Sequence, residues 1–320
     1  MRLIRGLRAL PRFADGCVAT IGNFDGVHLG HRSIIRELAD EGARRGLPVV
    51  VVLFEPQPLE YFRPEDAPPR LTRLREKLAC MRDLPVDAVL LLRFTSEFAA
   101  MPPDTFIQKV LVDGLRVRHL LIGDDFRFGH RRSGDYSLLR AASAAAGFDV
   151  ADTQSIQFDG VRVSSTLIRE TLSASNMARA TRLLGRPFFL CGRVIEGNRL
   201  GRSIGFPTAN MRVLGKTAPI SGVFAVTMDG IAAQPIPGVA NIGVRPTLGG
   251  RDDIRLETHL FDFDANIYGK RVSVYFHHKI RDEQRFQDIS ALKKQITQDV
   301  LSARAYFEHH ATNPLLTVTT

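Results

Sequence analysis

The first half of the chain alternates short apolar runs with segments that have the periodicity of an amphipathic helix. The longest apolar run, from Leu47 to Phe54, includes four consecutive valines. It has the length of a strand, whereas a membrane-spanning helix needs about 18 apolar residues. The predicted strands are residues 17–21, 48–54, 87–92 and 119–122, and the predicted helices are residues 30–46, 72–84, 104–115 and 136–146. Nearly continuous apolar strands that alternate with helices predict an α/β domain whose parallel sheet is covered on both faces.

Three loops of this half follow predicted strands, at residues 22–26, 55–71 and 123–135. Ligands bind to sheets of this kind outside the carboxyl ends of the strands. We therefore expect the functional residues of the first half in these loops.

The pattern changes after residue 184, where Gly185-Arg186-Pro187 has the composition of a joint. Later segments alternate polar and apolar residues between turns, as in an antiparallel barrel or sandwich. The predicted strands are residues 188–195, 223–228, 238–242, 255–261 and 272–276. A final amphipathic pattern over 288–309, with apolar residues at 289, 292, 296, 300 and 301, predicts a long helix that packs on this barrel. We predict two domains, residues 1–184 and residues 185–320, the second a β-barrel closed by a long helix.

The charge of the chain favours polyanionic ligands. Lys and Arg number 43 against 34 Asp and Glu, which gives a net charge of +9. Nucleic acid, a membrane surface and phosphorylated small molecules all fit such a chain. The basic excess is divided almost evenly between the two halves and forms no Lys/Arg block, so we expect small molecules rather than nucleic acid or membrane as partners.

Two further features concern the compartment. Cys17, Cys80 and Cys191 form no Cys-x-x-Cys pair, which argues against disulfides and a zinc ribbon and predicts a reducing, cytoplasmic location. The first dozen residues carry four arginines, as in an organelle transit peptide, but have no apolar signal core and little serine. We interpret them as a lead-in to the first strand.

A glycine-rich turn with two histidines joins the first predicted strand to the first helix. Its sequence, residues 21–31, reads Ile-Gly-Asn-Phe-Asp-Gly-Val-His-Leu-Gly-His. The free N–H groups at a helix start favour an anion, and His28 and His31, three residues apart, face the same way. A metal pair is the alternative, but zinc needs a third ligand and no suitable one stands out. His-x-Gly-His in this context resembles the nucleotidyltransferase superfamily, in which it contacts the α-phosphate of ATP or CTP.

A second motif, Ser164-Ser165-Thr166-Leu167-Ile168-Arg169, opens a downstream helix. Serine and threonine are ordinary N-cap residues, so a purely structural role is one interpretation. Hydroxyls, free N–H groups and an arginine one turn later also suit a triphosphate. The same superfamily contains this Ser-Ser-Thr-x-x-Arg pattern.

Aromatic residues gather in two strand-end loops, at 54–62 and 123–129. Such rings often pack locally, but two such loops above one site would also form a slot for a flat ring such as an isoalloxazine. The candidate residues are Pro56, Pro58, Phe62, Asp125, Phe126 and Phe128.

The second half carries its own phosphate-binding pattern. Gly197, Gly201 and Gly205 allow a loop to approach phosphates, although no Walker A sequence is present. Thr208 and Asn210 offer oxygens for a magnesium ion, or they form a self-satisfied turn. Glu257 lies between apolar neighbours in a predicted strand, where it is either idle or a base for a substrate hydroxyl.

In this order, these motifs resemble the bacterial bifunctional riboflavin kinase/FMN adenylyltransferase family over nearly the whole chain. Segments 22–31, 123–129 and 164–169 match the adenylyltransferase half. Segments 205–210 and 241–247, Glu257, and Ile280-Arg281-Asp282-Glu283 with Phe286 match the kinase half and its end. One departure is Gln57, where the family often has histidine, so no role for a histidine is carried over there.

The resemblance implies a Rossmann-like nucleotidyltransferase domain followed by a kinase domain, acting on riboflavin, FMN, FAD, ATP and Mg²⁺. His28 and His31 would stabilise the adenylyl-transfer transition state, and Glu257 would be the kinase base. The implied ATP-binding residues of the transferase are Gly22, Asn23, Asp25, Ser164, Ser165, Thr166 and Arg169. Those of the kinase are Gly201, Arg202, Gly205, Phe206 and Pro207, with Thr208 and Asn210 as magnesium ligands.

Two rival functions remain open at this stage. A cytidylyl- or adenylyltransferase for another phosphorylated substrate would share the histidine motif but would not need the segment at 205–210. An RNA-binding protein related to class I tRNA synthetases would suit the basic charge, but the chain has no obvious anticodon or zinc module. We expect a monomer or a weak homo-oligomer.

Overall fold

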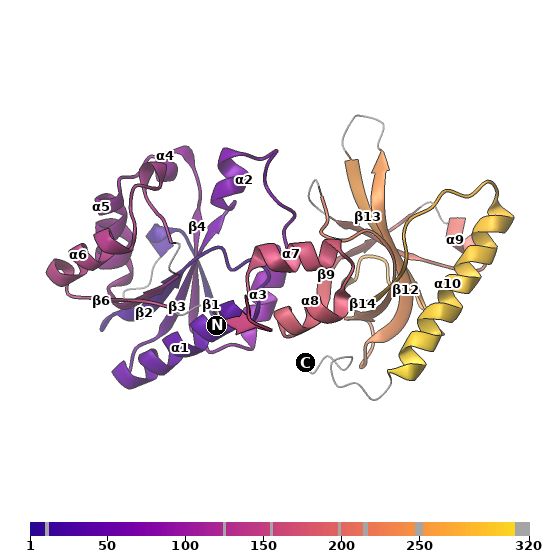
Figure 1. Ribbon diagram of the computed structural model, residues 1–320, viewed down its shortest axis with the longest axis horizontal. Coiled ribbons are helices and arrows are strands. Elements are labelled where there is room, and N and C mark those ends of the chain that lie inside the picture. The colour runs from indigo at the N-terminus through magenta and orange to yellow at the C-terminus, as the bar shows by residue number, and fades with distance from the viewer. Residues whose placement is uncertain are drawn as a thin grey trace. The chain divides into compact units, whose positions relative to one another are not determined.

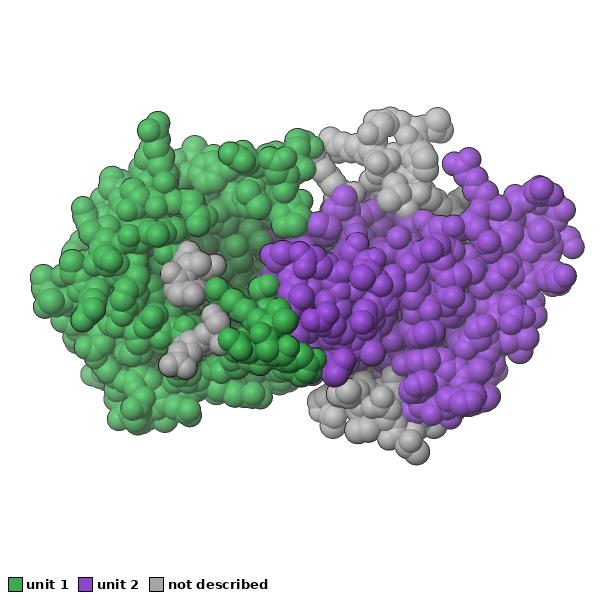
Figure 2. All heavy atoms as spheres, viewed as in Figure 1, with its two compact units in different colours: residues 1–68, 72–164 green, residues 69–71, 165–320 purple. Residues whose placement is uncertain are grey.

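The computed structural model describes residues 1–9, 13–123, 126–153, 156–197, 200–213, 217–246 and 252–310. The chain forms two compact units (Figure 2). Unit 1 contains residues 1–68 and 72–164, and unit 2 contains residues 69–71 and 165–320. None of the described helices is both long and apolar enough to cross a lipid bilayer.

Unit 1 is built on a six-stranded parallel sheet in the order β1-β4-β3-β2-β5-β6 (Figure 1). Its strands are β1 (Arg2–Arg5), β2 (Cys17–Ile21), β3 (Val49–Glu55), β4 (Ala88–Arg93), β5 (Val117–Ile122) and β6 (Asp149–Asp152). Its helices are α1 (Leu29–Arg45), α2 (Pro58–Phe62), α3 (Leu74–Arg82), α4 (Ser96–Ala99), α5 (Pro103–Phe106), a π-helix (Ile107–Leu115) and α6 (Tyr136–Ala146). A small hairpin, β7 (Gln157–Phe158) and β8 (Val161–Arg162), precedes the end of the unit. The predicted α/β fold with a parallel sheet is confirmed.

The two edge strands differ from the sequence-based prediction. The amino-terminal segment is more than a lead-in, because β1 pairs with β4 from Arg2 to Arg5. The other edge, β6, begins and ends with an aspartate and has no buried residue, so its sequence carries no strong strand signal. Both strands are short, as edge strands of soluble proteins often are.

The strand order places a switch point beside β2. From β2 the chain runs through α1 to β3 and then to β4 on one side, and it later crosses to β5 on the other side of β2. All five residues of β2 are buried, so both faces of the strand are covered. A crevice for a ligand forms at such a switch point, outside the carboxyl ends of the two strands that diverge. The loops after β2 and β5 are therefore the expected site of unit 1.

Unit 2 is a closed antiparallel barrel in the order β10-β13-β12-β11-β14-β9. Its strands are β9 (Phe188–Ile195), β10 (Ala209–Val213), β11 (Gly222–Asp229), β12 (Ile236–Pro246), β13 (Asp252–Leu260) and β14 (Arg271–Arg281). Its helices are α7 (Ser165–Ser173), α8 (Met177–Leu184), α9 (Leu200–Ser203) and α10 (Ile289–His309). The predicted antiparallel barrel with a final long helix is confirmed (Figure 1).

Packing divides the chain before α7, whereas the predicted joint at 184/185 lies after α8. The domain boundary of the sequence analysis stays a prediction. The strand β10 was not predicted, because Pro207 and Asn210 are poor strand formers and mask its alternation.

The helix α10 packs on the barrel with a face that differs from the predicted one. Ile289 and Leu301 are 58% and 56% exposed, although both were expected to face the barrel. Val300 contacts the barrel as predicted. The other apolar contacts with β11 and β12 come from Ala303 and two aromatic residues, Tyr306 and Phe307, which were not predicted.

A buried ion pair fixes α10 to the end of β14. Asp299 is 3% exposed and accepts two hydrogen bonds from the guanidinium of Arg281, at 2.8 and 2.7 Å. Gln295 donates a third, at 2.9 Å. Removing one member of a buried pair leaves the other charge uncompensated, so the pair constrains this end of the fold.

Asp299→Asn should therefore destabilise α10 by about 3 kcal/mol, because Arg281 would stay in place without a counter-charge. Hydrogen exchange of the α10 amides measures this loss. Asp262→Asn is the matched control, since Asp262 makes a two-bonded pair with Arg304 of the same helix but is largely exposed. That variant should cost less than about 1 kcal/mol. Equal losses in the two variants would contradict the role given to burial.

Candidate active sites

The loop after β2 has an unusual backbone. Phe24 and Val27 have φ values of 47° and 43°, and Gly26 has a φ of 88°. Non-glycine residues rarely occupy this left-handed region, so neighbouring contacts must hold the loop. The strain lies between the end of β2 and His28, the N-cap residue of α1.

Thr72 holds one side of this loop. The carboxylate of Asp25, 2% exposed, accepts hydrogen bonds from the Thr72 N–H at 2.9 Å and from its hydroxyl at 3.2 Å. The same hydroxyl oxygen accepts from the N–H of Gly26 at 2.8 Å. Asp25, proposed from the sequence as an ATP-binding residue, thus has a clear local role in shaping the turn.

A buried lysine holds the other side. Lys77 of α3 is 1% exposed, and its ammonium donates to the backbone carbonyl of Asn23. The side chain of Asn23 is exposed, so this contact fixes the backbone and leaves the amide for a ligand. Thr72 and Lys77 were missed in the sequence analysis, because a threonine and a lysine at the start of a helix carry no signal of their own.

His28 and His31 lie together at the start of α1. Their rings stack with centroids 3.6 Å apart and planes 21° apart, and Nδ1 of His28 accepts from the N–H of His31 at 3.4 Å. A Cβ on Gly30 would come within 3.2 Å of the His28 ring, which is a tight contact, and within 3.5 Å of the Val163 carbonyl. Packing against the His28 ring therefore favours glycine in His-x-Gly-His, and residue 163 lies beside the histidines.

The environment of His31 keeps its ring neutral. Burial, and then the nearby His28 and Lys77, lower the pKa of His31 well below its usual value of 6.5. Its Nδ1 atom is buried and has no hydrogen-bond partner among the described residues. A neutral imidazole can donate one hydrogen bond to a phosphate oxygen from whichever nitrogen carries the proton.

The serine-rich motif straddles the two units. Ser164 is the last residue of unit 1 and follows Val163. Ser165 is the first residue of α7, and Thr166 and Arg169 lie in that helix. Within unit 2, the Arg169 Nε donates to the carbonyl of Pro69 at 2.7 Å, which orients the guanidinium. The phosphate-binding role of the motif stays a prediction.

The aromatic candidates of unit 1 fall into two environments. Phe128 is 6% exposed and packs on Phe106 in the core, while the partly exposed Phe126 stacks on it at 5.6 Å. Phe62 is 59% exposed and meets Phe94 edge-on at 5.5 Å. Local packing therefore explains Phe128, whereas Phe62 and Phe126 can reach a ligand.

Two of the remaining candidates, Pro56 and Pro58, precede Phe62 in the chain. Pro56 and Pro58 flank Gln57, which is 8% exposed and whose amide nitrogen has no partner among the described residues. Asp125 lies outside the described residues.

In unit 2, a closed loop precedes β10. The Phe206 N–H donates to the Gly201 carbonyl at 2.7 Å, and a Cβ on Gly201 would approach the Phe206 carbonyl to 2.3 Å. Gly205 has a φ of 92°. A ring nitrogen of His259 on β13 bonds the Pro207 carbonyl at 2.9 Å, so the loop is held against the barrel. Arg202 lies in α9, and its side chain is outside the described part.

Three polar residues lie in register on one face of the barrel wall. Asn210 of β10 and Asn241 of β12 both lie directly opposite Glu257 of β13. Opposed residues of antiparallel strands point to the same face, with Cβ atoms about 4.5–5.5 Å apart. The side-chain amide of Asn241 donates to Glu283 at 3.2 Å. Asn241 was quoted in the sequence analysis but was not proposed as a site residue; only the register shows its position beside Glu257.

Thr208 and Asn210 have the donor set that magnesium prefers. The Asn210 side-chain amide lies 3.4 Å from the Thr208 hydroxyl. Residue 197 is a glycine, and a Cβ at that position would come within 2.4 Å of the Asn210 amide. A hydroxyl and an amide oxygen are hard ligands that suit Mg²⁺ shared with phosphates. No group of three His, Cys, Asp or Glu suited to a metal occurs within the described ranges.

The imidazole of His31 should remain neutral at pH 6.5, because the folded protein disfavours its charged form. The unfolded chain binds this proton at about pH 6.5, so stability falls as the pH drops below that value. Imidazole signals in nitrogen-15 NMR spectra measure the protonation directly, with His31→Gln used to assign them. A His31 ring that is half protonated at pH 6.5 would contradict the lowered pKa.

Comparison with known proteins covers both units. The FAD synthetase family matches residues 10–167, and the riboflavin kinase family matches residues 184–307. The bifunctional riboflavin kinase/FMN adenylyltransferase of Escherichia coli K12 is 51% identical over 96% of this chain and 98% of its own. The enzyme of the same name from Haemophilus influenzae is 48% identical over 96% of this chain and 99% of its own.

A solved structure shows the same architecture. A Streptococcus pneumoniae protein described as a macrolide-efflux protein is 28% identical, with a TM-score of 0.82 over 95% of this chain and 99% of its own. The resemblance stated from the sequence motifs is therefore confirmed along the whole chain. The chain belongs to the bifunctional riboflavin kinase/FMN adenylyltransferase family.

Proposed function

We propose that this chain makes FAD from riboflavin in two ATP-dependent steps, at two separate sites. The riboflavin kinase step transfers the γ-phosphoryl group of ATP to riboflavin and yields FMN and ADP. The FMN adenylyltransferase step transfers AMP from a second ATP to FMN and yields FAD and pyrophosphate. The observation that carries this proposal is the presence of two unlike polar clusters, the stacked His28–His31 pair in unit 1 and the Asn210–Glu257–Asn241 row in unit 2.

In the kinase site, Glu257 accepts the proton of the riboflavin hydroxyl as the phosphoryl group arrives. The closed loop with Gly201, Gly205, Phe206 and Pro207 binds ATP, and Arg202 adds a positive charge. Thr208 and Asn210 hold a magnesium ion, which would neutralise charge on the ATP phosphates. Residues on rigid strands favour this chemistry because they keep the base and the phosphate ligands at fixed separations.

In the transferase site no protein base is needed, because the attacking FMN phosphate is already an anion. His28 and His31 stabilise the charge that builds on the α-phosphate. The loop after β2, which contains Gly22, Asn23 and Asp25, positions the nucleotide. Ser164, Ser165, Thr166 and Arg169 bind the departing phosphates. The flavin ring binds at the aromatic loops, through Pro56, Pro58, Phe62, Asp125, Phe126 and Phe128.

The surroundings of the enzyme are proposed from its chemistry and composition. Its partners are flavins and nucleotides, without nucleic acid or membrane, in a monomer or weak homo-oligomer. The three cysteines form no disulfide within the described part of the chain, which suits a cytoplasmic, reducing compartment. The riboflavin kinase match over residues 184–307 argues against both rivals, since neither another nucleotidyltransferase nor an RNA-binding protein needs that unit.

His28→Ala should abolish FAD formation and leave FMN formation unchanged, because the histidine acts only in the adenylyltransferase site. Chromatographic separation of the flavins, after incubation with riboflavin, ATP and magnesium, measures both products. His130→Ala, at an exposed position of the same unit, is the control and should retain both activities. Parallel loss of FMN and FAD in His28→Ala would show that the sites are not separate.

Glu257→Gln should lower the rate of riboflavin phosphorylation by about two to four orders of magnitude, as expected for loss of a general base. Adenylylation of added FMN should continue at its normal rate. Glu308→Gln, an exposed change on α10, serves as the control for charge. A normal kinase rate in Glu257→Gln would exclude the glutamate from the reaction.

A further inference from the structure

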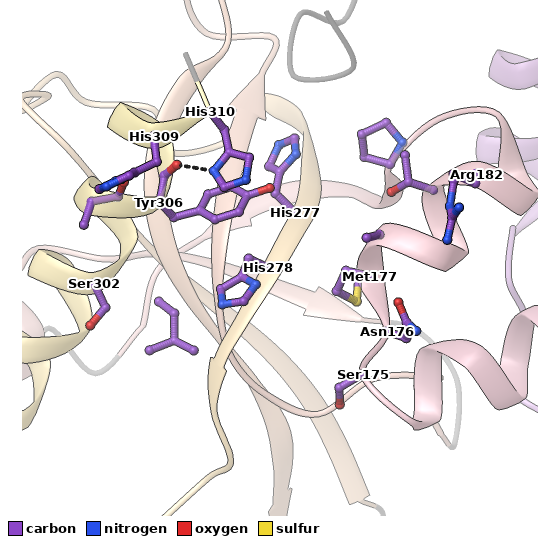
Figure 3. A pocket seen from close by; sticks show the side chains of 15 residues that line it. Ser175, Asn176, Met177, Arg182, His277, His278, Ser302, Tyr306, His309 and His310 are labelled. Carbon is purple, nitrogen blue, oxygen red and sulfur yellow. Dashed lines mark hydrogen bonds between the residues drawn. The ribbon is translucent and has the colours of Figure 1, made fainter. Parts of the chain in front are cut away.

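A cavity of about 1080 Å³ lies within unit 2, away from the residues assigned to the kinase reaction. Its floor is β14, and its walls are α8 and the carboxyl-terminal half of α10, which face each other across that strand (Figure 3). Neither Thr208, Asn210 nor Glu257 lines it. Small-molecule pockets commonly have volumes of about 300–1,000 Å³, so the cavity is large enough for a nucleotide-sized ligand.

The lining of the cavity contains one arginine and four histidines. The wall formed by α8 contributes Arg182, the floor contributes His277 and His278, and the end of α10 contributes His309 and its C-cap residue, His310. None of the described lining residues is an aspartate or a glutamate. A lining that can only be neutral or positive favours an anion.

The two histidines of α10 are oriented by their own helix. Nδ1 of His309 donates to the Ala305 carbonyl at 2.7 Å, and Nδ1 of His310 donates to the Tyr306 carbonyl at 2.8 Å. Both bonds occupy the same ring position, so Nε2 is the atom that each ring offers to a ligand.

One wall also presents a flat aromatic surface. Tyr306 lies between His278 and His310, with ring centroids 5.1 and 4.3 Å away and ring planes tilted by only 8° and 24°. The three rings form a short column of nearly parallel planes. A column of this kind can be extended by another flat ring at either end, because offset stacking of aromatic rings is favourable.

His277 anchors the floor rather than supplying charge. Its Nε2 bonds the hydroxyl of Thr227 at 2.8 Å, and burial lowers its pKa to about 4. Arg182 is therefore the one permanently charged side chain among the described lining residues. A ligand of the right size contacts the ring column and the arginine together.

We propose that this cavity binds a small aromatic phosphate, a molecule in which one flat ring system is joined to a phosphate group. The ring stacks on the column of His278, Tyr306 and His310, and the phosphate is bound by Arg182. FMN and ADP, which the kinase reaction releases, are both members of this class. The site is a third one, beyond the two proposed reaction sites.

Equilibrium dialysis of the full chain against FMN and against ADP tests the proposal. For at least one of the two ligands, the binding isotherm should show one extra molecule bound per chain, referred to as the extra equivalent. Arg182→Gln and Tyr306→Leu should each lower the affinity of this extra equivalent at least tenfold. Both variants should keep the kinase and transferase KM values of the unmodified protein, because neither residue belongs to those sites. Arg179→Gln, a change on the same helix outside the cavity, should leave the extra equivalent intact.

Two further probes separate the parts of the ligand. Riboflavin has the ring without the phosphate, and pyrophosphate has phosphates without a ring, so neither should compete for the extra equivalent at concentrations where FMN or ADP fills it. Competition by pyrophosphate alone would show a simple anion site and overturn the proposal. Absence of any equivalent sensitive to Arg182→Gln and Tyr306→Leu, in variants that unfold at the normal temperature, would overturn it too.

Discussion

The site of unit 1 depends on the loop after β2, which must turn sharply at the centre of a parallel sheet and still keep a fixed shape. Three of its residues have left-handed backbone angles, and their cost is of order 1–3 kcal/mol for each non-glycine residue. The hydrogen bonds of Thr72 and Lys77 to the loop offset that cost. These contacts fix the turn that leads into His28 and the start of α1, so two residues outside the histidine motif determine the geometry of the motif.

Register plays the same role in the barrel. A shift of one residue in β13 would exchange the two faces of the strand, so Glu257 would enter the barrel interior and the buried Leu256 would face outward. The pairing of β13 with both β10 and β12 excludes such a shift, because each neighbour fixes the same alignment. The position of Glu257 beside Asn210 and Asn241 is therefore a consequence of strand pairing rather than of the local sequence around any one of them.

Sequence periodicity was sufficient for elements whose signals are local. Three elements have the predicted bounds: the strand at 17–21, the helix at 136–146 and the strand at 188–195. In each, the apolar pattern stops where a glycine or a polar residue begins the next loop. It failed where tertiary contacts decide. Asp299 is buried among the apolar positions of α10 because Arg281 reaches it from β14, and the sequence of the helix alone cannot reveal that partner. Thr72 and Asn241 were not predicted for the same reason. Thr72 bonds a loop that is distant in sequence, and Asn241 is placed beside Glu257 by strand register.

The contrast between the two sites follows from the state of the attacking group. A ribityl hydroxyl must lose a proton when it attacks phosphorus, so the kinase site needs a carboxylate on a rigid strand. An FMN phosphate carries its negative charge beforehand, so the transferase site needs donors and not a base. Burial lowers the pKa of His31, and a neutral ring of this kind can still donate one hydrogen bond to a phosphate oxygen. One chain thus needs two differently built sites, because its second substrate is the charged product of its first reaction.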